Sequence, residues 1–301
     1  MAAPARYRGR FAPSPTGPLH FGSLVTALAS RVDALAHGGE WLLRIDDLDQ
    51  GRCRPGMDDA ILRTLERFGF GWDGELRYQS HTTAAYAEAL ARLEALEMIY
   101  YCRCSRRQVA ANARRTGIEG PVYAGTCRDL GLDDTPGRAA RVRTGDDPLG
   151  FSDRVFGYRE QRLQRDVGDF VVRRADGFFA YQLAVVVDDA LAGIDQVVRG
   201  ADLLASTPRQ IHLQRLLGLP TPRYLHVPLV RDTQGRKLSK RDAAHPVDES
   251  DPLGALLAAW RHLEQVPPDT GLTLDEFWQW APGAWRPERM RTTARDEPDT
   301  L

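Results

Sequence analysis

Residues 10–23 read RFAPSPTGPLHFGS and connect a predicted strand to a predicted helix. Residues 7–11 have the character of a short strand, whereas residues 24–37 carry apolar side chains at helical spacing. The prolines and the glycine between them predict a rigid, tightly turned loop. Because free backbone N–H groups and the helix dipole point into such a loop, its position before a helix predicts an anion-binding site.

Two residues of this loop have properties suited to nucleotide binding. His20 can donate a hydrogen bond to a phosphate, and Gly22 permits the close approach of a flat ring or a backbone. A His-x-Gly triplet alone is a weak signal, because a proline-rich turn with a surface histidine has the same pattern. The interpretation therefore depends on the whole run.

The whole run resembles the first signature of class I aminoacyl-tRNA synthetases, in the form PSPTGxLHxG of the glutamyl branch. Ser23 stands where that family often has a second histidine or a threonine, and its hydroxyl can still bond a phosphate. The resemblance implies that His20 is catalytic and that it binds ATP together with Gly22 and Ser23. The resemblance also implies an amino-acid pocket that includes Phe11, Ala12, Pro13 and Ser14.

Composition limits the remaining possibilities. The 301 residues are enough for about two domains, and 43% hydrophobic with 27% charged residues is ordinary for a globular enzyme. No apolar run approaches about 18 residues and no signal peptide is recognisable, so we expect a cytoplasmic protein without a membrane partner. The net charge of −1 predicts no overall basic field, so nucleic-acid contacts would need a local basic surface.

Residues 40–46 read EWLLRID and predict a buried parallel strand that ends in acidic residues. Open α/β sheets bind ligands at the carboxyl ends of their strands, and an acidic cluster there suits an ammonium group. Solvated turn carboxylates are the alternative, above all for Asp47 and Asp49. The resemblance favours Asp46, which occupies the position of a family glutamate near the substrate's amino group but is one methylene shorter.

The order of predicted elements in the first hundred residues is β-α-β-α-α-β, with helices over 57–68 and 84–98 and a strand from 99. This order predicts an α/β fold with a Rossmann-like, doubly wound parallel sheet. We divide the chain into a first catalytic half (1–101), a zinc-bearing insertion (102–175), a second catalytic half (176–245) and a helical C-terminal extension with a tail (246–301).

Three cysteines, Cys102, Cys104 and Cys127, lie within 26 residues and are flanked by arginines that favour thiolates. This spacing predicts one structural zinc ion, with three reduced thiols as the alternative. No histidine is nearby, so a local fourth ligand would be Tyr123, Asp129 or water. Short paralogues of the glutamyl synthetases carry a Cys-x-Cys…Tyr-x₃-Cys zinc site, and this resemblance implies Tyr123.

Residues 140–174 alternate short apolar runs with Gly, Asp and Arg, which predicts short antiparallel strands. In class I synthetases an insertion between the two halves of the sheet holds the tRNA acceptor end. By that resemblance, arginines of the insertion could contact phosphates, and a charged surface without nucleic acid is the alternative. The arginines are Arg103, Arg106, Arg107, Arg114 and Arg115.

Two arginines are predicted at corresponding strand ends. Arg10 ends the first strand, and Arg199 ends a strand that begins at residue 195 and leads through Gly200 into a helix. A guanidinium there can hold a carboxylate in bidentate fashion. Two such arginines facing one pocket fit a substrate with two carboxylates, which is L-glutamate. The resemblance adds Tyr181 to the pocket.

Lys237 and Lys240 are the only lysines of the chain, among 40 basic residues, and they lie three positions apart in KLSK. Their isolation indicates a need for a compact, mobile ammonium group. KLSK resembles the second class I signature. That resemblance implies that both lysines bind ATP, which is expected with Mg²⁺, and stabilise charge on the α-phosphate and the departing pyrophosphate.

The resemblance covers residues 7–245, and the full glutamyl synthetases continue into a large helical anticodon-binding region, which we do not expect here. We expect a monomer, and the resemblance implies that it activates L-glutamate with ATP in the absence of tRNA. Glutamate would then be transferred to queuosine in the anticodon of tRNA(Asp). The alternatives are a short glutamyl-tRNA synthetase that charges tRNA(Glu) and a catalytically idle tRNA-binding module. The presence of His20, Lys237 and Lys240 argues against the idle module.

Overall fold

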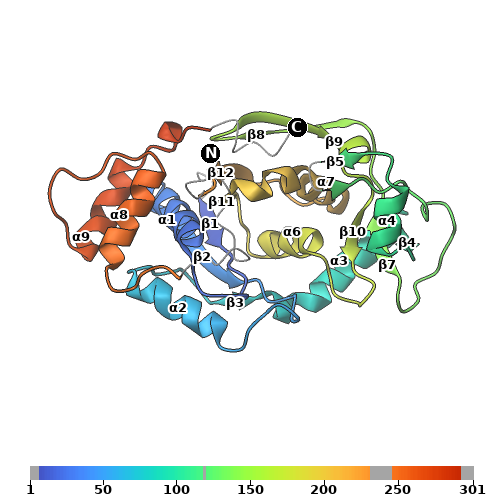
Figure 1. The fold of residues 1–301 in the computed structure, drawn as a ribbon, viewed down its shortest axis with the longest axis horizontal. Helices are drawn as coiled ribbons and strands as arrows, with labels where there is room; N and C mark the ends of the chain where they lie inside the picture. Colours follow the sequence, from blue (N-terminus) through green and yellow to red (C-terminus); the bar gives the residue numbers. More distant parts are fainter. Residues whose placement is uncertain (1–6, 118–119, 231–245, 293–301) are drawn as a thin grey trace, which may run out of the picture.

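The computed structural model describes residues 7–117, 120–230 and 246–292, and its centre is one layer of mainly parallel strands (Figure 1). The first group has the order β1-β2-β3 and is parallel throughout. The second has the order β11-β12-β8-β9. β1 lies beside β11, where the Asp195 amide donates to the Arg8 carbonyl at 3.1 Å. The expected α/β fold with a parallel sheet is therefore confirmed.

The strands of this layer are β1 (Arg8–Phe11), β2 (Glu40–Ile45), β3 (Arg77–Tyr78), β8 (Pro148–Asp153), β9 (Gly157–Arg162), β11 (Gln196–Gly200) and β12 (Arg223–Val227). The helices around it are α1 (Phe21–Ala36), α2 (Met57–Arg67), η1 (Gln79–Thr82), α3 (Thr83–Ala95), α6 (Tyr181–Leu191), η2 (Ala201–Ser206) and α7 (Thr207–Leu217). Among the described residues, no helix is long and apolar enough to cross a membrane.

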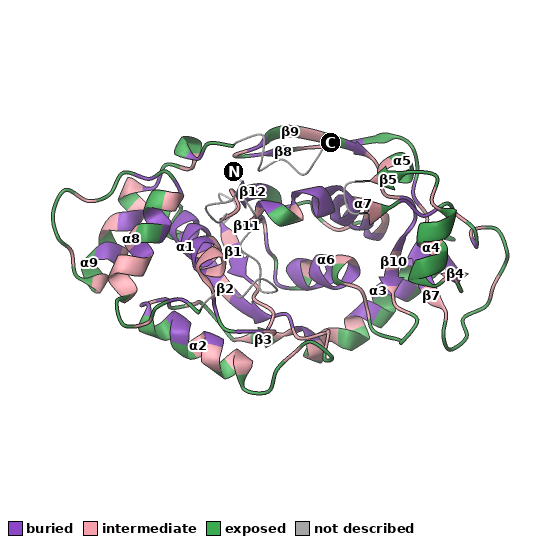
Figure 2. Cartoon of the chain, viewed as in Figure 1, coloured by how far each residue is buried: buried purple, intermediate pink, exposed green. Residues whose placement is uncertain are grey.

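Helix α1 lies next to the sheet, and more than half of its residues are buried (Figure 2). Its buried residues are not confined to one face: Leu24, Ala29 and Ala34, which point in different directions around the helix, are all buried. One side of α1 packs on β1, and the other contacts α8 (Pro252–His262) and α9 (Leu274–Ala284). This double burial fixes the position of the α1 N-terminus, where the quoted loop ends.

The strand expected from residue 99 forms, but it does not join the parallel layer. It is β4 (Ile99–Cys102), which pairs antiparallel with β7 (Ala139–Val142), and β7 pairs with β10 (Phe170–Arg173). The same part of the chain holds α4 (Arg106–Asn112), β5 (Thr116–Gly117), β6 (Gly120–Pro121) and α5 (Leu163–Asp166). This small antiparallel sheet and helices α8 and α9 lie at opposite ends of the molecule (Figure 1).

The antiparallel strands expected between residues 140 and 174 are divided between two sheets. Strands β7 and β10 remain in the insertion, whereas the hairpin β8–β9 joins the central layer through the parallel pair of Tyr224 with Asp153. The Asp153 carboxylate accepts a hydrogen bond from the backbone of His226 at 3.0 Å, which holds β8 against β12. This long-range polar contact, rather than local spacing, assigns the hairpin to the central layer.

A buried carboxylate joins the C-terminal helices to the sheet. Asp33 of α1 accepts hydrogen bonds from Tyr7 Oη at 2.5 Å, from both terminal nitrogens of Arg154 at 2.6 and 2.9 Å, and from Trp285 Nε1 at 2.8 Å. Burial acts to raise the pKa of Asp33, but Arg154 and the other donors outweigh it and hold the pKa below its ordinary value. Asp33 is therefore ionised at neutral pH and links four segments.

We expect Asp33→Asn to lower the free energy of unfolding by about 3 kcal/mol, because it leaves the Arg154 charge without its carboxylate partner. A depressed pKa stabilises the fold above the ordinary pKa of aspartate and ceases to do so as the pH falls. The difference between variant and parent should therefore shrink below about pH 4. Urea unfolding at pH 7 and at a pH well below 4 measures this difference. Exposed Asp59→Asn should change stability by less than about 0.5 kcal/mol, and an equal loss in both variants would contradict the argument.

Candidate active site

The loop after β1 and the first turn of α1 form one wall of a cavity of about 390 Å³. His20 is the N-cap of α1, and its Nδ1 accepts from the Ser23 amide at 3.3 Å, while Nε2 lies 3.1 Å from Ser23 Oγ. A Cβ on Gly22 would lie only 3.3 Å from the His20 imidazole, which is a tight contact. The glycine therefore leaves room for the ring. His20, Gly22 and Ser23 thus line the same cavity at a helix N-terminus.

Val227, the last residue of β12, and residues 228–230 line the same cavity. Lys237 and Lys240 lie in residues 231–245, outside the described part of the chain. The described chain ends at Val230 on the cavity wall and resumes at Pro246, which forms a bridge with His20. The described residues that flank this segment therefore lie on the cavity wall (Val230) and next to the cavity residue His20 (Pro246).

A second cavity of about 430 Å³ adjoins the first, and the two share Phe11, Ala12 and Ser14. It lies at the carboxyl ends of the neighbouring strands β1 and β11. Open α/β sheets bind ligands at such strand ends. Four residues expected in the amino-acid pocket line it from four different elements or their ends: Arg10, Asp46, Tyr181 and Arg199. Pro13 lines the first cavity instead.

The two pocket arginines have different partners. Arg10 donates from Nε and Nη2 to the two carboxylate oxygens of Asp189, each at 3.2 Å. Burial acts to raise the pKa of Asp189, but Arg10 and Arg44 outweigh it and hold the pKa below its ordinary value. The charge of Arg10 is therefore already compensated by a carboxylate within the protein.

Arg199 has only uncharged partners in the described part of the chain. It donates from Nε to His226 Nε2 at 3.0 Å, from Nη1 to Gln210 Oε1 at 2.7 Å and from Nη2 to Thr207 Oγ1 at 2.8 Å. Only 4% of Arg199 is exposed. A buried guanidinium without a carboxylate contact favours an anionic group in the cavity beside it.

Asp46 provides negative charge in the same cavity. Its Oδ1 accepts from Arg44 Nε at 2.7 Å, and Arg44 also donates to Asp189 at 2.7 Å. Burial raises the pKa of Asp46 to about 6, although the attraction of Arg44 opposes the rise. At neutral pH the carboxylate is charged, and it can accept from an ammonium group.

If Asp46 binds the ammonium group of the substrate, activation of glutamate should depend on pH. The carboxylate is ionised above its pKa, so kcat/KM for glutamate should be constant above about pH 6 and fall below it, by about tenfold per pH unit. Asp46→Asn should have a low kcat/KM without this decline. ATP–pyrophosphate exchange between pH 5 and pH 8 measures both, and a flat profile for the parent chain would contradict the assignment.

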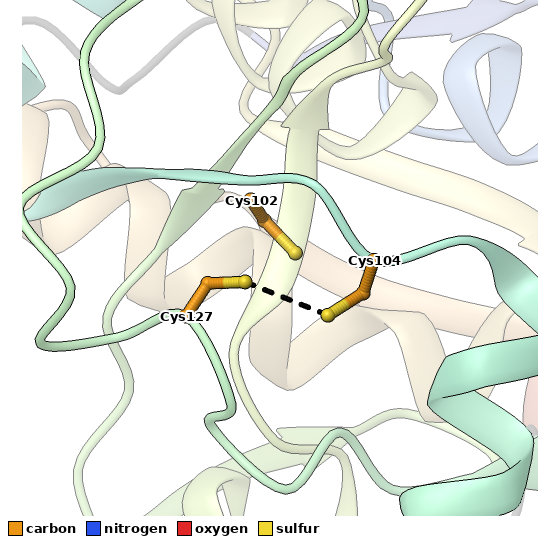
Figure 3. A group of neighbouring side chains, drawn as sticks. All are labelled: Cys102, Cys104 and Cys127. Atoms are coloured by element: carbon orange, nitrogen blue, oxygen red, sulfur yellow. Dashed lines mark hydrogen bonds between the residues drawn. The ribbon is translucent and has the colours of Figure 1, made fainter.

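The sulfur atoms of Cys102, Cys104 and Cys127 converge on one point in the insertion (Figure 3). All three lie within 4.8 Å of one another, and the Cys104 and Cys127 sulfurs are 3.5 Å apart. Tyr123 Oη lies 3.3 Å from the Cys102 sulfur and 3.9 Å from the Cys104 sulfur. A tetrahedral zinc ion needs ligand separations of about 3.5–3.8 Å, so these four side chains could hold it after shifts of no more than about 1 Å.

The other candidate ligand and the remaining cysteine are elsewhere. Asp129 is 88% exposed and pairs with Arg143 at 3.5 Å. The Cys53 thiol donates to the Asp47 carbonyl at 3.7 Å, far along the chain from the cluster. At the cluster, burial acts to raise the pKa of Cys102, but hydrogen bonds from Tyr123 and Arg141 outweigh it and lower the pKa to about 7.

The arginines considered for phosphate contacts are exposed on the insertion. Two of them, Arg114 and Arg115, line a cavity of about 580 Å³ together with Arg128 and Arg165. Acidic residues line the same cavity, and Arg128 lies 3.6 Å from Asp169. This surface therefore has mixed charge, and its arginines are not gathered into a purely basic patch.

Sequence reasoning missed the residues that hold the pocket arginines. Asp189 follows an apolar run in α6, and this buried acid was a signal that a cation lies near. His226 and Gln210, which contact Arg199, are on β12 and α7 and had no recognisable motif. Arg52 and Asp202 line both cavities and were also not singled out.

Comparison with known families agrees with this arrangement. The family model described as tRNA synthetases class I (E and Q), catalytic domain, matches residues 6–255. The matched region includes the insertion and every described residue of the two adjoining cavities. The fold and the site thus define a class I tRNA synthetase catalytic domain.

Two curated relatives indicate which branch of this family the chain belongs to. The glutamyl-Q tRNA(Asp) synthetase of Chromobacterium violaceum is 51% identical over 286 residues, which cover 95% of this chain and 96% of the relative. The protein of the same name from Cupriavidus metallidurans is 53% identical over 291 residues, 95% of this chain and 93% of the relative. The chain therefore belongs to the glutamyl-Q tRNA(Asp) synthetase family.

A solved structure supports the fold. The glutamate tRNA ligase of Elizabethkingia meningosepticum, in complex with its amino acid, superimposes with a TM-score of 0.81 at 23% identity. The alignment covers 96% of this chain and 66% of the longer ligase. At this identity the likeness concerns the fold, and the fold includes the Cys-bearing insertion and the C-terminal helices.

Proposed function

We propose that this chain activates L-glutamate with ATP to glutamyl-adenylate and pyrophosphate without tRNA, and then transfers glutamate to queuosine in the anticodon of tRNA(Asp). One observation carries the first step: two cavities share the wall formed by Phe11, Ala12 and Ser14. The first has a helix N-terminus and His20, and the second has Arg199 and Asp46. Adjoining cavities of this kind suit a phosphate beside an amino acid.

In the activation step an oxygen of the glutamate α-carboxylate attacks the α-phosphorus of ATP. The bond from that phosphorus to the oxygen bridging to the β-phosphate breaks, and pyrophosphate leaves with the electron pair. No side chain needs to form a covalent bond, so the protein contributes positioning and charge stabilisation. Mg²⁺ accompanies ATP and neutralises phosphate charge.

We assign the roles as follows. Arg199 binds the side-chain carboxylate of glutamate, because its charge has no carboxylate partner among the described residues. Asp46 binds the ammonium group. His20, at the N-cap of α1, contacts the ATP phosphates. Lys237 and Lys240 stabilise the negative charge that develops on the α-phosphate and pyrophosphate, as their KLSK motif implies.

Arg10, Tyr181 and residues 11–14 complete the amino-acid pocket, and Gly22 and Ser23 complete the ATP site. Residues 1–101 and 176–245 form the catalytic domain, 102–175 the insertion and 246–301 the C-terminal extension. One zinc ion is bound by Cys102, Cys104, Tyr123 and Cys127. The separations of these four ligand groups support the zinc site, and the ion would join β4 to the segment that follows it.

The acceptor is proposed from the names of the relatives, which specify tRNA(Asp) and the Q nucleoside. Because its substrates are tRNA, ATP and glutamate, we place the reaction in the cytoplasm. The test uses radiolabelled glutamate with tRNA(Asp) from cells able and unable to make queuosine, and with tRNA(Glu). We expect label only in queuosine-containing tRNA(Asp). Equal labelling of both tRNA(Asp) samples, or efficient labelling of tRNA(Glu), would overturn the assignment.

A further inference from the structure

Behind Arg199, outside the residues that line the cavities, are two buried groups that have no part in the proposed activation step. His226 of β12 is 0% exposed, and Asp153, at the end of β8, is 5% exposed. His226 Nδ1 lies 2.7 Å from Asp153 Oδ2, and His226 Nε2 accepts from Arg199 Nε at 3.0 Å. The three side chains form one line from the hairpin β8–β9 to the substrate cavity.

The hydrogen bonds of this line determine the tautomer of the imidazole. An arginine Nε–H can only donate, so Nε2 of His226 must present its lone pair. Nδ1 then carries the proton and donates to Asp153. Burial lowers the pKa of His226, against the opposing effect of Asp153. His226 is thus a neutral ring with a fixed acceptor directed at the guanidinium.

Asp153 is itself held in place by the backbone. Its Oδ1 accepts from the amides of Val155 and Phe156, both at 2.9 Å, and its Oδ2 also accepts from the His226 amide at 3.0 Å. A carboxylate with these donors has little freedom to rotate. The orientation of the imidazole is therefore set by the turn between β8 and β9.

A neutral acceptor behind Arg199 does not compensate the charge of the guanidinium, whereas a carboxylate would. Asp189 compensates the charge of Arg10 directly, with two hydrogen bonds. His226 fixes the plane of Arg199 but leaves its positive charge for a ligand, and Gln210 and Thr207 are likewise uncharged. Of the two pocket arginines, the one held by neutral groups is the better suited to select a carboxylate over an amide.

We propose that His226, oriented by Asp153, is a positioning residue that holds the Arg199 guanidinium for the side-chain carboxylate of glutamate and so favours glutamate over glutamine. This inference rests on the proposed activation of glutamate. His226 does not touch the substrate. It acts through the plane and the uncompensated charge of Arg199.

A pair of substitutions separates the two hydrogen bonds of His226. The amide of His226→Asn corresponds in position to Nδ1, so it can keep the contact with Asp153 but does not reach Arg199. The amide of His226→Gln corresponds to Nε2 and can accept from Arg199. We expect the Asn variant to raise the KM for glutamate about tenfold, to lower the preference for glutamate over glutamine similarly, and to leave the KM for ATP unchanged. The Gln variant should restore most of the glutamate KM.

His212→Asn is the matched control. His212 is a part-buried histidine whose Nε2 lies 2.9 Å from the Arg143 carbonyl, and its ring packs on Phe170, away from both cavities. Steady-state ATP–pyrophosphate exchange with glutamate or glutamine measures all variants. An unchanged glutamate KM in His226→Asn, or equal increases in the KM values for glutamate and ATP, would overturn the proposal. Absence of glutamate-dependent exchange in the parent chain would instead refute the proposed function.

A measurement on the parent chain keeps the proposal testable if the buried variants do not fold. In the ¹⁵N-histidine spectrum, His226 should be a neutral ring protonated on Nδ1 between pH 6 and pH 8, and its Nε2 signal should shift when glutamate is added. The same signal should not respond to ATP alone. A ring protonated on Nε2, or no response to glutamate, would contradict the proposed positioning role.

Discussion

Cys127→Ser is expected to abolish tight zinc binding and to unfold the part of the insertion around the cysteine cluster. Binding of a structural zinc ion contributes about 10–16 kcal/mol of apparent free energy. The local core is small: its buried members are Tyr100, Cys102, Tyr123 and Cys127, and helix α4 has no buried residue at all. So few apolar contacts cannot hold the segment without the ion.

Metal analysis of protein purified without chelator should give one zinc per chain for the parent and none for Cys127→Ser. Hydrogen exchange should show lost protection around residues 102–130. Cys53→Ser is the matched control, because Cys53 lies outside the cluster and should leave the zinc content unchanged. A parent chain without zinc would contradict the site, and full zinc affinity in Tyr123→Phe would remove only the fourth ligand.

Lys240→Ala is expected to lower the rate of glutamate-dependent ATP–pyrophosphate exchange about 100- to 1,000-fold. Loss of one preorganised group that stabilises charge in the transition state typically costs about 2.7–4 kcal/mol. Lys240 is outside the described residues, but the chain leaves the cavity wall at Val230 and returns beside His20 at Pro246. The described residues on the two sides of its segment are thus Val230, which lines the cavity proposed to bind ATP, and Pro246, which forms a bridge with His20.

The parent and Lys240→Ala should unfold at the same temperature and bind glutamate equally in a calorimetric titration, because the lysine has no assigned role in the amino-acid pocket. Lys240→Arg should retain more activity than Lys240→Ala, since the charge remains although its geometry changes. An exchange rate within twofold of the parent would exclude Lys240 from the mechanism.

Local sequence patterns were sufficient for much of the fold and the site. The helices predicted over 57–68 and 84–98 are α2 and α3, with ends shifted by up to three residues. Arg10, Asp46 and Arg199 could be expected in one pocket because each lies at the carboxyl end of a parallel strand or just beyond it. Those ends meet at one edge of a sheet. The positions of these residues at strand ends therefore predicted a shared pocket without any knowledge of side-chain contacts.

The sequence did not reveal which strands pair with one another. β4 was expected in the parallel layer and pairs with β7 instead, and the hairpin β8–β9 joins β12. Backbone hydrogen bonds between distant strands have no signature in a single sequence, because any strand edge can accept another strand.

The sequence by itself determined which chemical groups stand at the strand ends and at the helix N-terminus, since these positions follow from local turns and periodicity. Only the tertiary structure decided their electrostatic state. Arg10 is compensated by Asp189, which is 179 positions away, whereas Arg199 has the neutral His226 as its partner. The physical reason is that the charge available to a ligand depends on buried neighbours, and burial brings together residues whose separation along the chain carries no signal.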